Sequence, residues 1–251
     1  MRTKVKTDSE IKAMRESGRM LATVLQVLRA QVTPGMSTKQ LDDIAARELK
    51  ALGGVPAFLG YQDFPAMLCV SLNNEVVHGI PRAGRSIKAG DIVSMDFGVT
   101  YQGMITDGAI SVIVGKATQK QHAELVRYTE ASLQAGINVV HDQVRTGDIG
   151  NAVQTVLNKF NYGIVRDLVG HGVGHQLHED PNIPNYGRPD TGPWLEAGMT
   201  IAIEPMATLG TDRVYIADDG WTILTADDSW AAHFEHTVLI TPDGAEILTT
   251  V

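Results

Sequence analysis

Two short segments of the chain share an unusual pattern, an apolar strand that ends on an acidic residue. Residues 88–96 are KAGDIVSMD and residues 196–204 are EAGMTIAIE, so each begins with a charged residue, Ala and Gly. They end on Asp96 and Glu204. Acidic residues are disfavoured in strands, and an unpaired carboxylate is costly to bury. A chain that carries this pattern twice must place both acids where something compensates their charge.

The predicted elements follow the same order around both segments, with helices first and strands after them. Apolar residues at helical spacing, and apolar runs bounded by turn residues, mark these elements. They are helices over 10–32, 41–52, 120–144 and 149–160, and strands over 91–100, 104–114, 196–204 and 233–241. Asp8 and Ser9 are predicted to cap the first helix. Ser37 and Gln40 form a capping-box pattern before the second helix.

This repetition predicts one domain that is built from two similar halves. A period of about 110 residues is too long for a solenoid of small repeats. No low-complexity linker separates the two parts. We therefore predict a single domain over residues 1–251, with halves at about 9–115 and 120–250.

Composition excludes several classes of protein. The 251 residues are 43% hydrophobic and 20% charged, which allows a sizeable core and argues against disorder. The net charge of −8 provides no basic surface for nucleic acid or an anionic membrane. Cys69 is the one cysteine, so no intrachain disulfide can form. The N-terminal sequence has no apolar signal segment, and no run is long enough to span a membrane. We expect a cytoplasmic protein.

The first acidic strand is followed by a second one that carries Asp107. A two-residue turn at Tyr101–Gln102 would place Asp96 directly opposite Asp107 on one face, with their Cβ atoms about 5 Å apart. Like charges in that position destabilise a sheet. Either one carboxyl group is protonated or a positive charge lies between the two.

The second half offers the same arrangement. Pairing across a turn at Asp219–Gly220 places Glu204 opposite Glu235, and no Lys or Arg neighbours any of the four acids in sequence. Four carboxylates carry a charge of about −4, which two divalent ions would neutralise. If the halves pack face to face, the sequence predicts an oxygen-rich site for two metal ions.

Histidines add candidate nitrogen ligands. The Gly-rich segment GHGVGHQLHEDP carries His171, His175 and His178, and its glycines oppose the helical zinc motif HExxH. His78 lies between a predicted strand and a turn. Two further histidines flank Glu235 and are candidate ligands or partners of ligands: His233 and His236. His122 and His141 lie in helical patterns and are expected at the surface.

Five motifs carry a family resemblance over nearly the whole chain: NEVVHGIP, GDIVSMDFG, GHGVGHQLHEDP, IEPM and FEHTVLIT. In this order and spacing they resemble the type I methionine aminopeptidases, M24 metallopeptidases with the pita-bread fold. The resemblance implies an α+β fold, in which a pseudo-two-fold symmetric antiparallel sheet is flanked by two pairs of helices. It also implies five metal ligands, which are Asp96, Asp107, His171, Glu204 and Glu235.

The resemblance implies removal of the N-terminal methionine from nascent proteins, preferentially when the second residue is small. The implied reaction is hydroxide attack at a dinuclear metal site, with Co, Mn, Fe(II) or Zn as candidate ions. His78 and His178 would contact the substrate and its scissile amide, and Glu204 would act as general base. A monovalent cation is implied near Asn73 and Ala231. Expected partners are N-terminal Met peptides and nascent chains, with ribosome association as a hypothesis and a monomeric protein.

The side chain of the substrate methionine requires an apolar pocket. By resemblance five residues line this pocket: Tyr61, Phe64, Cys69, Leu177 and Trp221. Two positions depart from the pattern of many relatives. Asp107 lies in TDGA rather than GDSA or GDT, and Leu177 stands where an aromatic residue is expected. We therefore expect the pocket to differ in shape at Leu177.

Two rival interpretations remain at this stage. An Xaa-Pro aminopeptidase or prolidase would have a further N-terminal domain, whereas helical patterns here start at about residue 8. A non-enzymatic binding module of the same fold would have lost ligands, and all five are present.

Overall fold

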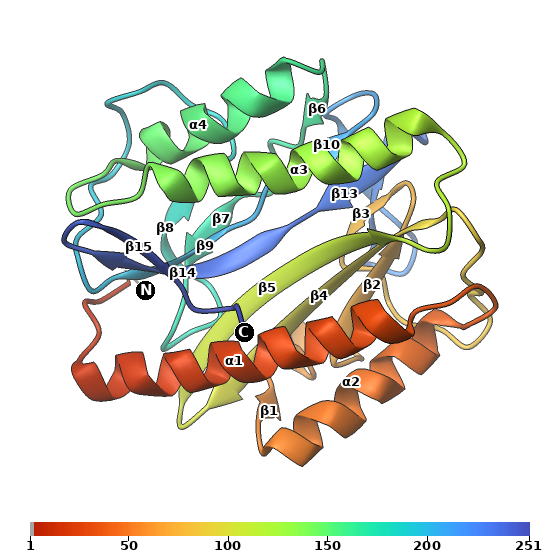
Figure 1. Ribbon diagram of the computed structural model, residues 1–251, viewed down its shortest axis with the longest axis horizontal. Coiled ribbons are helices and arrows are strands. Elements are labelled where there is room, and N and C mark those ends of the chain that lie inside the picture. Colours follow the sequence, from red (N-terminus) through yellow and green to blue (C-terminus); the bar gives the residue numbers. More distant parts are fainter. Residues whose placement is uncertain (1–2) are drawn as a thin grey trace.

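The computed structural model describes residues 3–251, so the first two residues of the predicted domain lie outside it. Its main sheet has nine strands in the order β1-β4-β5-β14-β9-β7-β8, with β2 paired to β4 and β15 to β14. Figure 1 shows two pairs of helices in front of this sheet. Helices α1 and α2 cover the part built from β2, β4 and β5, and α3 and α4 cover the part near β8, β9 and β14.

All four predicted helices are present, with shifted ends. They are α1 Asp8–Gln31, α2 Thr38–Leu52, α3 Lys120–Asn138 and α4 Thr146–Asn158. The predicted caps of α1 are wrong, because Thr7 is the N-cap and forms a reciprocal capping box with Glu10. The capping box of Ser37 and Gln40 is confirmed. The third helix ends at Asn138, before the predicted residue 144, and the chain turns again at Gln143, whose φ is 64°.

The strands are short except for one long hairpin. They are β1 Val55–Pro56, β2 Leu68–Leu72, β3 Glu75–Val77, β4 Ile92–Tyr101, β5 Met104–Ile113, β6 Gly163–Ile164, β7 Gly170–Gly172, β8 Glu179–Ile183, β9 Thr200–Ile203, β10 Met206–Thr208, β11 Val214–Ile216, β12 Ile223–Thr225, β13 Ala231–His233, β14 Glu235–Thr241 and β15 Gly244–Ile247. The predicted last strand is interrupted at Phe234, which divides it into β13 and β14.

The predicted register of β4 and β5 is wrong by two residues. Asp96 pairs with Ala109, and Asp107 pairs with Gly98, so the two acids are diagonal neighbours. The turn lies at Gln102–Gly103, where both residues have positive φ, 49° and 81°. Glycine adopts this conformation at no steric cost, which favours the turn that contains it. A shift of two residues leaves every side chain on its predicted face.

The predicted register of the second pair is confirmed, although the hairpin is interrupted. His236 pairs with Ile203, and this register extends to Glu204 beside Glu235. The same register continues through β10 with β13 and β11 with β12, up to a turn around Asp219–Gly220. Residues 200–241 therefore form one long antiparallel hairpin whose outer part leaves the main sheet.

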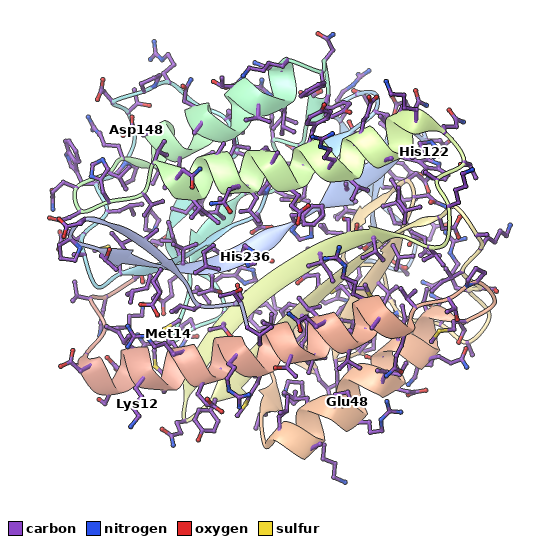
Figure 2. The ribbon with its side chains drawn as sticks, in the orientation of Figure 1. Lys12, Met14, Glu48, His122, Asp148 and His236 are labelled. Atoms are coloured by element: carbon purple, nitrogen blue, oxygen red, sulfur yellow. The ribbon has the colours of Figure 1, made fainter. Side chains whose placement is uncertain are left out.

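Each pair of helices covers its own hydrophobic cluster. Leucines of α1 and α2 pack on β2 and β4, where Met95 and Phe97 are fully buried. Apolar residues of α3 and α4 pack on β9 and β14, which contribute Ile203 and Val238 to this cluster. Figure 2 shows Lys12 projecting from the outer edge of α1 and Met14 on its other side. The acids alternate with these core residues along β4 and β14, so they lie on the sheet face turned away from the helices.

Among residues 3–251, no helix is long and apolar enough to cross a membrane. The division of the chain into halves at about 9–115 and 120–250 stays a prediction.

Candidate metal centre

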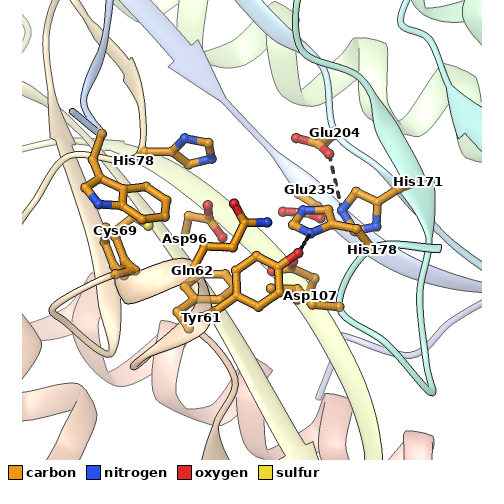
Figure 3. A pocket seen from close by; sticks show the side chains of 14 residues that line it. Tyr61, Gln62, Cys69, His78, Asp96, Asp107, His171, His178, Glu204 and Glu235 are labelled. Carbon is orange, nitrogen blue, oxygen red and sulfur yellow. Dashed lines mark hydrogen bonds and ion pairs between the residues drawn. The ribbon is translucent and has the colours of Figure 1, made fainter. Parts of the chain in front are cut away.

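The registers of four adjacent strands, β4, β5, β14 and β9, place the acids in a row across the sheet. Asp96 on β4 pairs with Ala109 on β5, and Ala109 also pairs with Glu235 on β14. Asp107 lies two residues from Ala109 on the same face, and Glu204 lies next to Glu235. The four predicted carboxylates therefore gather around one point, as Figure 3 shows.

His171 joins this group from β7. It pairs with Ala202 on β9, two residues before Glu204, so its side chain lies on the same face. Its Nδ1 lies 2.9 Å from the carbonyl oxygen of Gly172. Because a carbonyl only accepts, Nδ1 carries the hydrogen and the lone pair is on Nε2. Nε2 points into the site, 3.5 Å from Oε1 of Glu204.

The donor atoms form two groups in which all members lie within 4.8 Å of one another. One group comprises Asp107, His171 and Glu235, and the other comprises Glu204, His233 and Glu235. Glu235 belongs to both groups, so its carboxylate lies between them. Such a shared carboxylate is suited to bridge two ions.

Burial makes the uncompensated acids costly. Desolvation, followed by repulsion from Asp107, raises the pKa values of Asp96, Glu204 and Glu235 well above their ordinary values. Desolvation also raises the pKa of Asp107, to about 7, against the lowering effect of the Gly108 N–H. Desolvation lowers the pKa of His171 to about 3, so its imidazole is neutral at pH 7.

The donor set fits divalent metal ions. Oδ1 of Asp96 and Oε1 of Glu235 are buried and have no hydrogen-bond partner. Within the described part of the chain, no Lys or Arg forms an ion pair with any of the four acids. A buried polar atom without a partner is rare in native proteins, and a cation would satisfy these oxygens.

All twelve predicted site residues line a single cavity. They are Tyr61, Phe64, Cys69, His78, Asp96, Asp107, His171, Leu177, His178, Glu204, Trp221 and Glu235. Two further lining residues were missed, Phe58 and Gln62. One signal points to Phe58, because Gly98 on β4 leaves room for its ring: a Cβ there would lie 2.5 Å from Cε1.

The apolar end of the cavity is closed by aromatic contacts. Trp221 follows the tip of the long hairpin, where Asp219 accepts its backbone N–H at 3.0 Å. Its ring meets that of Phe64 edge to face, with centroids 5.0 Å apart. Strand β12 pairs with β3, and β3 ends directly before His78, so this pairing brings the hairpin close to His78. The centroids of the His78 and Trp221 rings are 6.3 Å apart.

His78 is held in a left-handed backbone conformation, with φ at 58°. Residues other than glycine adopt it at a cost, and such positions cluster at functional sites. The next residue, Gly79, packs against β2, where a Cβ would lie 2.3 Å from the carbonyl oxygen of Val70. Desolvation lowers the pKa of His78 to about 4, so its ring is neutral at pH 7.

His178 is oriented by a hydrogen bond to Tyr61. The Tyr61 hydroxyl lies 2.8 Å from Nδ1 of His178, and Figure 3 shows this contact beside His171. The rings of His171 and His178 lie 4.3 Å apart. The loop before His178 is held by the residue that follows it, because the Glu179 carboxylate accepts hydrogen bonds from the backbone N–H groups of His175 and Gln176.

The remaining histidines separate into different environments. His175 contacts Glu10 on α1 at 2.7 Å, outside the cavity. His141 is exposed, as predicted. The surface prediction for His122 is wrong, because it is 4% exposed and stacks on Trp230 with centroids 3.7 Å apart. A helical pattern does not reveal that an aromatic ring covers the polar side chain.

Comparisons with known proteins agree with this geometry. A family model described as metallopeptidase family M24 matches residues 12–242. The chain is 44% identical over 247 residues to the methionine aminopeptidase of Clostridium perfringens, with 98% of each chain covered. It is also similar to the crystal structure of the methionine aminopeptidase from Thermotoga maritima, with a TM-score of 0.97 and 44% identity over 99% of this chain and all of that one.

The prolidase from Pyrococcus furiosus shows a more distant likeness. It has a TM-score of 0.78 and 23% identity, over 98% of this chain and 65% of that one. At this identity the two proteins share the fold alone. Together with the closer structure, it confirms the predicted fold.

Proposed function

The chain belongs to metallopeptidase family M24, and we propose that it removes the N-terminal methionine from peptides and nascent proteins. The observation that supports this most directly is one cavity with two ends. Four acids and His171 converge at one end, and Phe64, Leu177 and Trp221 line the other. A substrate that fits both ends has an apolar side chain next to a bond that is hydrolysed.

We propose Asp96, Asp107, His171, Glu204 and Glu235 as the ligands of two divalent ions. Four carboxylates and one imidazole form a predominantly hard donor set, suited to Mn, Fe(II), Co or Zn. When bound, such ions polarise a carbonyl oxygen and lower the pKa of a water toward about 7. Glu235, which belongs to both donor groups, would bridge the two positions.

Glu204 is proposed as the group that moves the proton. Its Oε1 faces His171, and its Oε2 faces the opposite side of the site. A carboxylate with a raised pKa can accept a proton from the attacking water and give it to the leaving amine. Hydroxide attack at the carbonyl carbon is the proposed step, and the amide C–N bond breaks as the amine takes up the proton.

The two neutral histidines are proposed to hold the substrate. If the Tyr61 hydroxyl donates to Nδ1 of His178, Nε2 carries the hydrogen and can donate to the carbonyl oxygen as negative charge develops there. His78 lies between the metal-binding end and Trp221, so it is suited to contact the scissile amide. Both side chains would act as neutral donors, because burial lowers their pKa values.

The preference for methionine is attributed to the apolar end of the cavity. Its lining combines aromatic rings, among them Phe64 and Trp221, with the smaller or flexible side chains of Cys69 and Leu177. An unbranched thioether fills such a space and makes favourable contacts with aromatic rings. A preference for a small second residue is part of the proposal, since that residue must fit beside the histidines.

The test uses metal-stripped protein and two tripeptides, Met-Ala-Ser and Ala-Pro-Ala, with Co, Mn, Fe(II) or Zn added back separately. We expect methionine release only with metal and no cleavage before proline. Glu204→Gln should abolish release while the fold is retained. Cleavage of Ala-Pro-Ala alone would assign the chain to the prolidase side of the family, and cleavage of neither peptide would overturn the proposal.

The proposal also covers a monovalent ion near the site and the location and partners of the protein. The proposal includes a monovalent cation bound by backbone carbonyl groups near Asn73 and Ala231, two residues that are held together by a hydrogen bond of 2.7 Å from the Ala231 N–H to the Asn73 carbonyl oxygen. A cytoplasmic location is proposed from the expected substrate, which emerges from ribosomes, and the protein is proposed to act as a monomer. Co-sedimentation with ribosomes would test direct association.

A further inference from the structure

We propose that His233 is a sixth protein ligand of the metal centre, a second imidazole that binds from the side of Glu204 opposite His171. This proposal rests on the proposed metal-dependent function and adds one donor to it. The predicted ligand set contains a single nitrogen, from His171. The structure places a second ring nitrogen at comparable distance from the same acids.

The backbone of His233 is fixed so that its ring faces the acids. Its N–H donates to Oγ of Ser111 at 2.9 Å, and the same hydroxyl donates to its carbonyl oxygen at 2.8 Å. His233 ends β13 opposite Met206, two residues before Glu235. With Phe234 packed in the core under the helices, His233 and Glu235 share the other face.

The distances match ligands of a common ion better than hydrogen-bonded partners. Nε2 of His233 lies 3.6 Å from Oε2 of Glu204 and 4.0 Å from Oε2 of Glu235. Both separations are too long for a hydrogen bond. Two ligand atoms bound about 2.1 Å from one tetrahedral ion lie about 3.4 Å apart, close to the separation from Glu204.

The ring of His233 is otherwise without a partner. The residue is 1% exposed, and neither Nδ1 nor Nε2 has a hydrogen-bond partner within the described structure. A buried polar group without a partner is costly. Coordination by Nε2 would remove this cost at one nitrogen. One imidazole lies beside each carboxylate oxygen of Glu204, since Nε2 of His171 is 3.5 Å from Oε1 and Nε2 of His233 is 3.6 Å from Oε2.

His236 provides an internal contrast. It flanks Glu235 on the other side in sequence, but its Nδ1 contacts the hydroxyl of Thr249 at 2.8 Å. Figure 2 shows it between α1 and α3, on the helix-covered face of the sheet. The sequence left both histidines as candidate ligands, and the geometry assigns only His233 to the centre.

A second imidazole changes the expected metal preference. Nitrogen donors favour Co, Fe(II) and Zn over Mn, which prefers an all-oxygen environment. Replacing His233 by Gln should therefore weaken Co binding more than Mn binding. We expect the dissociation constant for Co to rise about tenfold or more, as for the loss of other groups that support a metal site.

The decisive measurement is a crystal structure of the wild-type chain loaded with Co, with metal positions taken from anomalous scattering. We expect Nε2 of His233 within about 2.2 Å of an ion. A separation above about 3 Å, with the ring bonded to Glu204 or to water instead, would overturn the proposal. This readout does not depend on turnover, so it stands or fails separately from methionine release.

Calorimetric titration of metal-stripped protein provides the second measurement. His233→Gln should raise the dissociation constant for Co, whereas the matched variant His236→Gln should leave it unchanged. Thermal unfolding of both variants without metal controls for misfolding. Equal Co affinity in wild type and folded His233→Gln would also overturn the proposal. Methionine release by wild type is unaffected by either outcome.

Discussion

A buried ion pair outside the cavity supports the loop that carries His178. Nζ of Lys6 lies 3.2 Å from Oε2 of Glu179, and both side chains are at most 1% exposed. Lys6 also donates to the hydroxyl of Thr3 at 2.7 Å. The other oxygen of Glu179 accepts the N–H groups of His175 and Gln176. Lys6→Met therefore leaves a buried carboxylate without its cation.

The expected cost follows from the burial of both partners. Removing one partner of a buried ion pair typically destabilises by about 3–5 kcal/mol, because the remaining charge is desolvated and unpaired. A domain has about 5–15 kcal/mol of stability in total, so Lys6→Met should remove a large share of it. Since His178 directly precedes Glu179, we also expect a lower kcat/KM for methionine release.

Urea unfolding at pH 7 measures the stability change. The double variant Lys6→Met/Glu179→Gln should recover part of the loss, because a neutral amide oxygen can still accept the two backbone N–H groups. The exposed pair of Arg15 and Glu246 is the matched control, with side chains 53% and 37% exposed. Arg15→Met should cost at most about 1 kcal/mol. A loss for Lys6→Met as small as that for Arg15→Met would show that the buried pair contributes little to stability.

Three further outcomes are expected. Tyr61→Phe should lower kcat about tenfold with little change in KM, because His178, the proposed donor to the oxyanion, is kept and only the hydrogen bond that orients it is lost. Steady-state kinetics on Met-Ala-Ser measures this. Gly98→Ala should push the Phe58 ring into the cavity and raise KM, while urea unfolding shows a loss of about 1–3 kcal/mol. Metal-stripped protein should lose thermal stability as pH rises through about 7, since burial raises the pKa of Asp107 to about 7 and folding favours its protonated form. Added metal should remove this dependence.

The sequence predicted which acids lie close together, because the pattern of a strand fixes which side chains share a face. The error in the register of Asp96 and Asp107 illustrates this. Placing the turn one residue early shifted the pairing by two, an even number, so both acids stayed on the correct face. The cue for the true turn was Gly103, whose positive φ suits a two-residue hairpin better than Tyr101 does.

Other features could not be predicted because they depend on contacts between distant segments. Gln62 enters the cavity from an irregular turn, where its φ is 47°, and no periodicity marks such a position. The buried pair of Lys6 and Glu179 joins residues 173 positions apart. A terminal lysine is ordinarily exposed, and only the folded chain shows that β8 and the segment before α1 enclose it.

The candidate metal centre depends on the pairing of two strands that are far apart in sequence, β5 and β14. Asp96 and Asp107 come from the β4–β5 hairpin, whereas His171 lies on β7, Glu204 directly follows β9, Glu235 begins β14 and the proposed sixth ligand, His233, ends β13. These two sets of residues meet where β5 pairs with β14. Thr237 on β14 forms two hydrogen bonds with the backbone of Asp107 on β5. Its hydroxyl donates to the carbonyl oxygen of Asp107 at 2.8 Å and accepts the Asp107 N–H at 2.9 Å. Because neither group alone supplies a complete donor set, a bound ion would join the two parts of the sheet as well as serve the reaction.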